Sequence, residues 1–129
     1  MPKDKKTKTS SRKQEASHQK TGREGEAAAC DFLIKKGYEI LETNYRYKKS
    51  EIDIIAKKEQ LLVFIEVKTK SYSSFGYPEE AVNTRKAQKV IEGAENYIYE
   101  LNWEKNIRFD IIAIDNSTNE ILHLEDAFY

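Results

Sequence analysis

Cysteine and long apolar segments are scarce in this sequence of 129 residues. The single cysteine, Cys30, can form no disulfide within the chain, and no Cys or His lies at metal-binding spacing from it, so we interpret it as a small core residue. No segment approaches the roughly 20 apolar residues of a membrane-spanning helix, and the N-terminal region has no hydrophobic segment of the signal-peptide kind. We therefore expect a cytoplasmic protein that does not bind a membrane.

The sequence also lacks net charge, because 22 basic residues balance 22 acidic residues. The distribution is uneven. Residues 1–20 hold seven of the basic residues and two of the acidic ones, whereas residues 21–129 hold 15 basic and 20 acidic residues. Residues 1–20 have no apolar run to offset the entropy lost on folding. We predict a disordered basic tail over residues 1–20 and a single folded domain over residues 21–129.

Capping residues and apolar periodicity predict two helices. The first covers about residues 22–36, because Thr21 and Glu24 have capping-box spacing and Gly37 can end it. The second begins after a cap at Asn83 or Thr84, reaches about residue 101 and carries an apolar stripe.

Five apolar or alternating segments predict strands. They cover residues 38–44, 51–56, 61–68, 107–114 and 120–124, with residues 46–50 as a basic turn and residues 71–78 as a mobile loop. The segment 61–68 is almost continuously apolar, which is typical of a central strand covered on both faces. The order α-β-β-β-α-β-β indicates an α/β fold in which helices flank a mixed central sheet.

Three acidic residues interrupt apolar segments of different elements. Glu26 falls on the apolar stripe of the first helix, Asp53 lies within the strand 51–56, and Glu66 breaks the apolar run of the strand 61–68. Period-two geometry places Glu66 and Lys68 on the same face of their strand, beside the strand that carries Asp53. An isolated Glu-x-Lys in a strand is usually a structural ion pair. Because buried ion pairs seldom stabilise a fold, three such interruptions favour a metal site.

Paired carboxylates on rigid strands suit a hard divalent cation such as Mg2+, or Mn2+. A cation held there would neutralise charge on a phosphate and help to deprotonate water. The ammonium of Lys68 would position that water or stabilise the developing negative charge.

Three sequence segments together are similar to a known pattern. They are Gly25-Glu26 at the start of an Ala-rich helix, residues 51–56 (EIDIIA) and residues 63–68 (VFIEVK). Over residues 22–128 the chain resembles the YraN-like family of uncharacterised bacterial proteins. That family is placed in the PD-(D/E)xK, or restriction-endonuclease-like, superfamily, where it is most similar to archaeal Holliday junction resolvases.

The resemblance implies specific roles. Asp53 and Glu66 would ligate the metal, Lys68 would be catalytic, and Glu26 would assist through a water or a second metal ion. Residues 75–78 and 108–110 also look like family segments without a named role. Two positions depart from the pattern, because Ser50 stands where Gly is expected and Lys70 where Arg is common.

Basic and aromatic side chains near these segments are candidates for contact with nucleic acid. The basic candidates are Arg46, Lys48, Lys49, Lys70, Arg85, Lys86 and Lys89, and the candidates for base stacking are Tyr47, Tyr72 and Phe75. Lys86 is the best single candidate, because it starts the second helix near the predicted catalytic face. We assign no role to His18 or His123.

Three hypotheses remain open. The first is a metal-dependent endonuclease that hydrolyses phosphodiester bonds in DNA, with branched or flapped DNA as a candidate substrate and a homodimer as a candidate assembly. The second is a non-catalytic nucleic-acid-binding protein that retains the nuclease fold, which the acidic domain favours. The third is an interaction protein that pairs through its edge strand 120–124. The presence of all four catalytic positions favours the first over the second.

Overall fold

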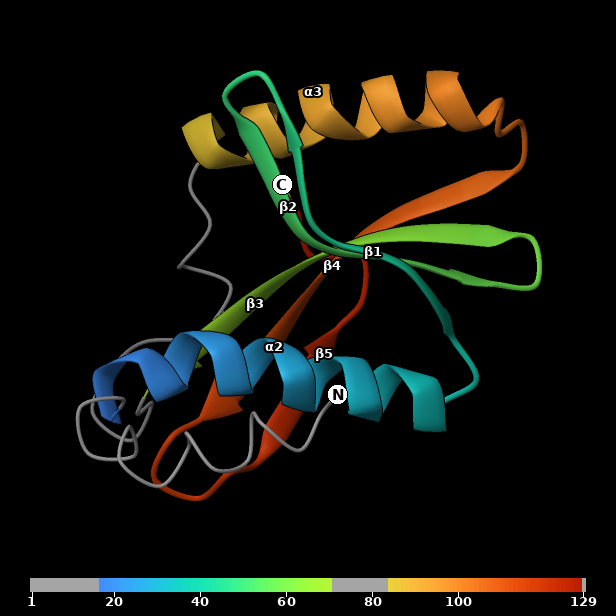
Figure 1. Ribbon diagram of the computed structural model, residues 1–129. Coiled ribbons are helices and arrows are strands. Elements are labelled where there is room, and N and C mark those ends of the chain that lie inside the picture. Colours follow the sequence, from blue (N-terminus) through green and yellow to red (C-terminus); the bar gives the residue numbers. More distant parts are fainter. Residues whose placement is uncertain (1–16, 71–83, 129) are drawn as a thin grey trace, which may run out of the picture.

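In a computed structural model, which describes residues 17–70 and 84–128, a five-stranded sheet carries one helix on each face (Figure 1). The described elements are α2 (Ser17–Lys35), β1 (Glu39–Tyr47), β2 (Ser50–Lys58), β3 (Leu61–Lys70), α3 (Thr84–Leu101), β4 (Asn106–Asp115) and β5 (Ile121–Leu124). This confirms the α/β fold in the predicted order α-β-β-β-α-β-β.

The strands follow one another in the sheet in chain order, from β1 to β5. Antiparallel pairs join β1 to β2, β2 to β3 and β4 to β5, whereas β3 and β4 are parallel and α3 forms the crossover between them. Strand β3 is therefore central. Glu66 of β3 is paired with Ile111 of β4, and Lys68 with Ala113.

Apolar side chains form a separate core on each face of the sheet. The core under α2 is built from Ala29, Leu33, Tyr38, Ile54, Ala56, Val63, Ile65, Ile112 and Ile114. The core under α3 is built from Ile52, Ile55, Leu62, Phe64, Val90, Ala94, Ile111 and Phe128. Alternate residues of β3 enter the two cores, which confirms that this strand is covered on both faces.

Two predicted boundaries are wrong. Helix α2 begins at Ser17 rather than at residue 22, so residues 17–20, assigned above to the tail, are helical. No Gly or Pro interrupts residues 17–20, and a threonine inside a helix costs little. Residues 46–50 are not a turn throughout. Arg46 pairs with Glu51 and Tyr47 with Ser50, so the turn is reduced to Lys48 and Lys49, with Lys48 at a φ of 57°.

Several predictions concern residues that the structure does not describe. These are residues 1–16 of the tail, the loop over residues 71–78 with Tyr72 and Phe75, and the cap at Asn83.

Candidate active site

Asp53 lies where β2 separates from β3. Pairing between these strands runs from Lys58 opposite Leu61 to Ile54 opposite Ile65. Beyond Ile54 the alternation of β2 is broken, because Ile52 enters the core under α3 whereas Ile54 enters the core under α2. The carboxylate of Asp53 spans the gap, and its Oδ2 accepts a hydrogen bond of 2.8 Å from the backbone N–H of Val67. Asp53 is thus fixed against β3.

Glu66 projects from β3 toward α3 and is almost completely buried, with 2% of its side chain exposed. Its Oε1 lies 3.0 Å from Nζ of Lys86, in the first turn of α3. In the part of the chain that the structure describes, Oε2 of Glu66 is the one buried side-chain oxygen or nitrogen atom with no hydrogen-bond partner. An unpaired oxygen on a buried carboxylate is costly, so this atom is suited to receive a ligand.

Burial disfavours the ionised forms of both carboxylates, and the charge of Asp53 adds to this effect at Glu66. Desolvation, followed by the charge of Asp53, raises the pKa of Glu66 to about 7, although Lys86 and Lys68 oppose the shift. Desolvation also raises the pKa of Asp53, against the hydrogen bond from Val67 and the charge of Lys86. A site in which both carboxylates are hard to ionise gains from a further positive charge.

Two ammonium groups share this site. Lys68 lies on the same strand as Glu66, as predicted, and its ammonium is close to that of Lys86. Burial and then the charge of Lys86 lower the pKa of Lys68. Burial acts in the same direction on Lys86, but its contacts with Glu66 outweigh that effect and raise its pKa. The two lysines therefore have different electrostatic environments.

Helix α2 brings Glu26 to the edge of this group. A Cβ atom at Gly25 would lie 2.5 Å from Oγ1 of Thr69, so glycine allows the helix to approach β3 closely. Glu26 is half-buried rather than buried, and its Oε1 accepts a hydrogen bond of 3.1 Å from Nδ2 of Asn44. Burial raises the pKa of Glu26, with smaller contributions from the charges of Asp53 and Glu51.

The three predicted carboxylates do not form one compact ligand set. Among residues 17–70 and 84–128, no three His, Cys, Asp or Glu side chains are grouped closely enough to hold a metal ion. Asp53 and Glu66 form the inner pair, whereas Glu26 interacts with Asp53 through charge and accepts a hydrogen bond from Asn44. Asn44 was not among the predicted site residues, because its φ of 54° and its position opposite α2 emerge only in the folded chain.

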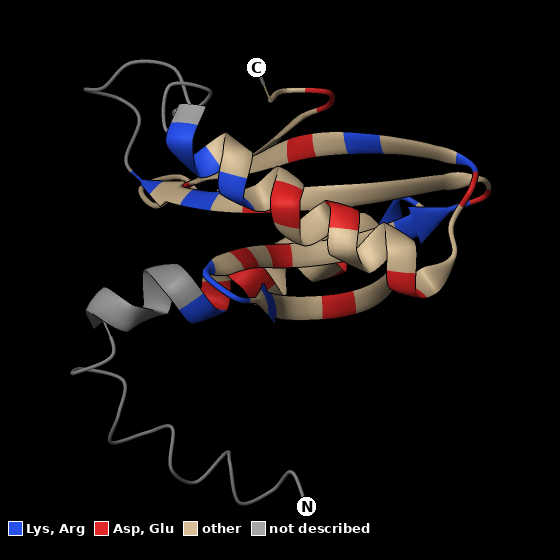
Figure 2. Ribbon diagram, turned by 90° about the horizontal axis from the view of Figure 1, so that it is seen from above, with Lys and Arg blue, Asp and Glu red and all other residues tan. Residues whose placement is uncertain are grey.

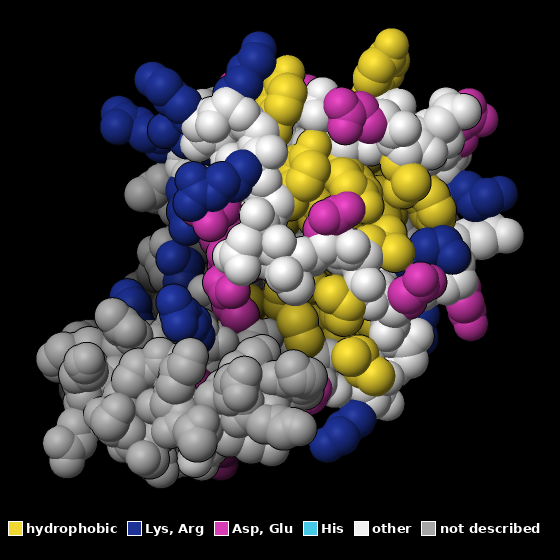
Figure 3. Space-filling view, in the orientation of Figure 1, with side chains coloured by type: hydrophobic (Ala, Val, Ile, Leu, Met, Phe, Trp, Pro, Cys, Tyr) yellow, Lys and Arg dark blue, Asp and Glu magenta, His cyan; other side chains and the backbone are white. Residues whose placement is uncertain are grey.

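The basic candidates are divided between several places. Lys49 and Lys86 line a pocket with Arg85 and Lys89, whereas Lys48 lies over the ring of Tyr47 in a separate groove. The exposed Arg46 pairs with Glu51 at 3.8 Å, and Lys70 is exposed at the end of β3. Along the ribbon of α3 in Figure 2, basic positions lie at the start of the helix and acidic positions follow. Figure 3 shows basic side chains gathered over the same end of α3.

A second buried carboxylate, Asp110, has a very different environment. It accepts two hydrogen bonds of 2.8 Å from Arg108, one of 2.7 Å from Nε2 of His123 and one of 3.0 Å from the N–H of Asp126. Burial alone would raise the pKa of Asp110, but the contacts with His123 and Arg108 lower it. No role was predicted for His123 from the sequence. The sequence did contain one indication of a buried ion pair, because Arg108 and Asp110 lie two residues apart on one face of a strand.

The fold and the cluster of Asp53, Glu66, Lys68 and Lys86 define a class: an α/β protein with two carboxylates and two lysines where strands of a mixed sheet separate. The chain belongs to the uncharacterised protein family UPF0102, whose family model matches residues 25–114. This confirms the resemblance to the YraN-like family.

Related sequences cover most of the chain. A UPF0102 protein of Flavobacterium psychrophilum is 47% identical over 116 residues, which is 88% of this chain and 98% of the relative. A UPF0102 protein of Thermodesulfovibrio yellowstonii is 48% identical over 108 residues, covering 84% of this chain and 95% of the relative. Both relatives thus align with this chain over almost their full length.

Among solved structures, the fold aligns with that of Pyrococcus furiosus SfsA in complex with Ca2+. The TM-score is 0.37 and the sequence identity is 16%, over 84% of this chain and 63% of the SfsA chain. Within the described residues, neither helix is long and apolar enough to cross a membrane.

Proposed function

We propose that this protein is a metal-dependent endonuclease that hydrolyses phosphodiester bonds in DNA. The observation that carries the proposal is the buried Glu66 carboxylate, whose Oε2 has no hydrogen-bond partner among the described residues. This carboxylate lies beside that of the half-buried Asp53. The resemblance to the restriction-endonuclease-like superfamily points to the same pair of residues.

The donor set fits a hard divalent cation, Mg2+ or Mn2+. Mg2+ is usually held by one or two carboxylates and takes its other ligands from water and substrate phosphates. A third protein carboxylate is therefore not required, and Asp53 and Glu66 would be the ligands. When bound, the cation supplies Lewis acidity, which neutralises charge on a phosphodiester and makes water a stronger acid.

The remaining residues act around this pair. Lys68 keeps a positive charge beside the carboxylates and would stabilise negative charge that develops on the phosphate. Glu26 would hold a water or a second cation next to Asp53. Burial and nearby acids raise the pKa of Glu26, so a cation there would favour its ionised form. The ammonium of Lys86 would move from Glu66 to the substrate phosphate once a cation satisfies that carboxylate. Arg46, Lys48, Lys49 and Lys70 would contact the DNA backbone outside the reacting centre.

A homodimer is a further part of the proposal. Strand β5 has only four residues, lies at the edge of the sheet and leaves Leu122 50% exposed. Pairing of two β5 edges would place two sites on one branched DNA substrate. Sedimentation at increasing protein concentration, with Leu122→Lys as the control variant, measures this association directly.

Calorimetric titration of Mg2+ and Mn2+ tests the proposed cation site without a choice of substrate. We expect saturable binding to the wild-type protein and its loss in Asp53→Asn and Glu66→Gln. Glu104→Gln, which removes an exposed carboxylate far from the pair, should bind like the wild type. Equal binding by Glu66→Gln and wild type, with and without DNA, would overturn the site.

Cleavage of branched, flapped and single-stranded DNAs then tests the activity. We expect Mg2+-dependent cleavage of at least one of these substrates, and a loss of about 100- to 1000-fold in Lys68→Ala with cation binding retained. Cation and DNA binding without any cleavage would instead support the non-catalytic nucleic-acid-binding alternative.

A further inference from the structure

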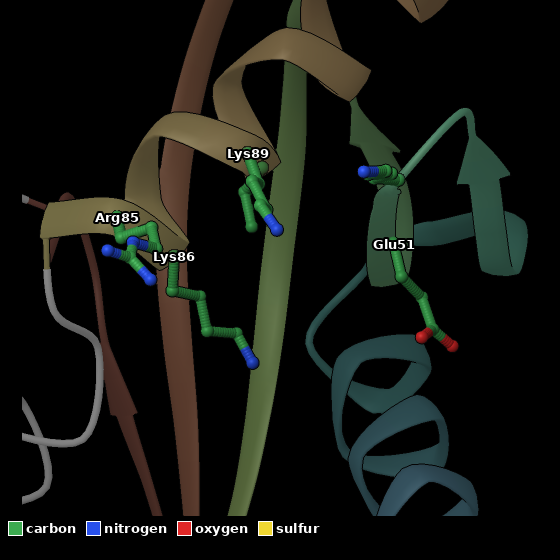
Figure 4. Close-up of a pocket in the computed structure, with 6 residues that line it drawn as sticks. Glu51, Arg85, Lys86 and Lys89 are labelled. Atoms are coloured by element: carbon green, nitrogen blue, oxygen red, sulfur yellow. The ribbon is translucent and has the colours of Figure 1, made fainter.

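A basic pocket lies between the start of α3 and the β1–β2 hairpin, next to the carboxylate pair. It has a volume of about 330 Å3 and is lined by Lys49 and Glu51 of the hairpin and by Arg85, Lys86, Lys89 and Val90 of α3. Figure 4 shows the side chains of Lys86 and Lys89 directed from α3 toward the space that separates it from β2. Four cationic side chains and one acidic side chain therefore line this pocket.

The pocket is connected to the candidate active site through one residue. Lys86 lines the pocket, and its Nζ also lies 3.0 Å from Oε1 of Glu66. Arg85 and Lys89 are exposed. Among the described residues neither forms an ion pair with a buried carboxylate, whereas Lys86 does. The positive charge of the pocket thus extends outward from the carboxylate pair.

We propose that this pocket binds a phosphate of the substrate strand that neighbours the phosphate to be cleaved. The inference rests on the proposed function and names the part of the site that would hold the strand. The guanidinium of Arg85 and the ammonium of Lys89 form charge-assisted hydrogen bonds with phosphate oxygens. A volume at the small end of the range for ligand sites accommodates one phosphate with its sugar rather than a base pair.

Glu51 sets a limit on the affinity of this pocket. Its carboxylate is 45% exposed and lies 3.8 Å from Arg46, so it is only partly neutralised. A phosphate in the pocket would be repelled by this charge. Removal of Glu51 should therefore strengthen binding, which is the opposite of the effect expected for a structural residue.

Fluorescence anisotropy with a labelled single-stranded oligothymidine of 12 nucleotides tests the pocket in EDTA, where no cleavage occurs. The test variant is Arg85→Ala/Lys89→Ala and the charge-matched control is Lys35→Ala/Lys105→Ala, which removes two exposed cations outside the pocket. We expect the test variant to bind about tenfold more weakly at low salt, with a slope of log K against log salt smaller by about 1. The control should remain within about twofold of wild type.

Substitution at Glu51 gives an independent result of opposite sign. Glu51→Gln should bind the oligonucleotide severalfold more tightly than wild type, whereas Glu104→Gln, with the same change in net charge, should not. Equal losses in the two double variants, or equal gains in the two glutamine variants, would overturn the phosphate site.

A poly-glutamate peptide of matched charge distinguishes the ligand class. If it binds as tightly as the oligonucleotide and loses as much affinity in Arg85→Ala/Lys89→Ala, the pocket accepts any polyanion and the proposal is wrong. The outcome is separable from that of the proposed function, because the measurement requires neither a divalent cation nor cleavage. Pocket-dependent binding without Mg2+-dependent cleavage would uphold phosphate binding by this pocket and refute the endonuclease.

Discussion

Glu66 and Asp110 are the two buried acidic side chains in the described part of the chain, and they lie on neighbouring strands. In the parallel pairing of β3 with β4, Ile65 is opposite Asp110 and Glu66 is opposite Ile111. The two carboxylates therefore sit one position apart on opposite faces of the sheet, Glu66 under α3 and Asp110 on the α2 side.

The two sites differ in how completely their carboxylates are satisfied. Asp110 accepts four hydrogen bonds, and its pKa is lowered. Glu66 has a single ion pair, an oxygen with no hydrogen bond among the described residues, and a raised pKa. A fully bonded buried carboxylate stabilises the fold that surrounds it, whereas an incompletely bonded one is retained at a cost to stability. The comparison indicates a structural role for Asp110 and supports the ligand-binding role proposed for Glu66.

Substitution of the two acids by their amides should destabilise the protein only at Asp110, and Asp110→Asn has the largest expected effect. It leaves the charge of Arg108 and the Nε2–H of His123 without their buried partner, so we expect a loss of about 3 kcal/mol in the free energy of unfolding. Glu66→Gln removes a charge that is poorly compensated, so it should lose no stability. Urea denaturation at pH 7 in EDTA, followed through the fluorescence of the single tryptophan, Trp103, measures both.

The comparison fails if Glu66→Gln is destabilised as strongly as Asp110→Asn, because Glu66 would then be a structural residue as well. A second amide variant, Glu104→Gln, supplies the baseline for removal of an exposed charge.

Between pH 5 and pH 8 the two sites should also respond differently. Because the pKa of Glu66 is raised to about 7 in the folded protein, its contribution to stability is present below the unfolded pKa of 4.5 and is lost as the pH rises through 7. Glu66→Gln does not titrate. Its stability relative to wild type should therefore rise by about 2 kcal/mol from pH 5 to pH 8.

Asp110 provides the control for this pH dependence. Its lowered pKa means that its stabilising effect is present above about pH 4 and is lost only in more acidic solution. The difference between Asp110→Asn and wild type should consequently stay constant between pH 5 and pH 8. A difference for Glu66→Gln that is also constant would show that Glu66 ionises with an ordinary pKa.

The part of the Glu66 site that sequence could predict is the part set by short-range geometry. Strand periodicity puts Glu66 and Lys68 on one face, and the adjoining hairpin strand brings Asp53 beside them. The ion pair between Lys86 and Glu66 could not be predicted from short-range geometry, because it depends on how α3 packs across the sheet. Lys86 was nevertheless singled out, as a contact for DNA, from its place at the start of the helix.

The Asp110 site was missed because its partners come from distant parts of the chain. Tyr38 contacts Arg108 from the segment after α2, and His123 reaches Asp110 from β5. No local period relates these positions, so they converge only through the order of strands in the sheet. The turn at Lys48 and Lys49 was misplaced for a related reason, because neither residue is a typical turn former and the cross-strand pairs of Tyr47 and Arg46 decide the boundary.

The smallest expected effect on stability is that of Lys36, which contacts the solvent-facing side of the Asp110 site through His123. Its Nζ lies 2.8 Å from Nδ1 of His123. An ammonium can only donate, so Nδ1 must accept and Nε2 must carry the hydrogen that His123 donates to Asp110. We expect 15N NMR at pH 8 to find the Nε2–H tautomer of His123, and Lys36→Met to lose only about 0.5–1 kcal/mol, because Asp110 keeps all its own hydrogen bonds. A loss as large as that of Asp110→Asn would mean that the stability of this site depends on its exposed end, and the contrast with the singly paired Glu66 would no longer hold.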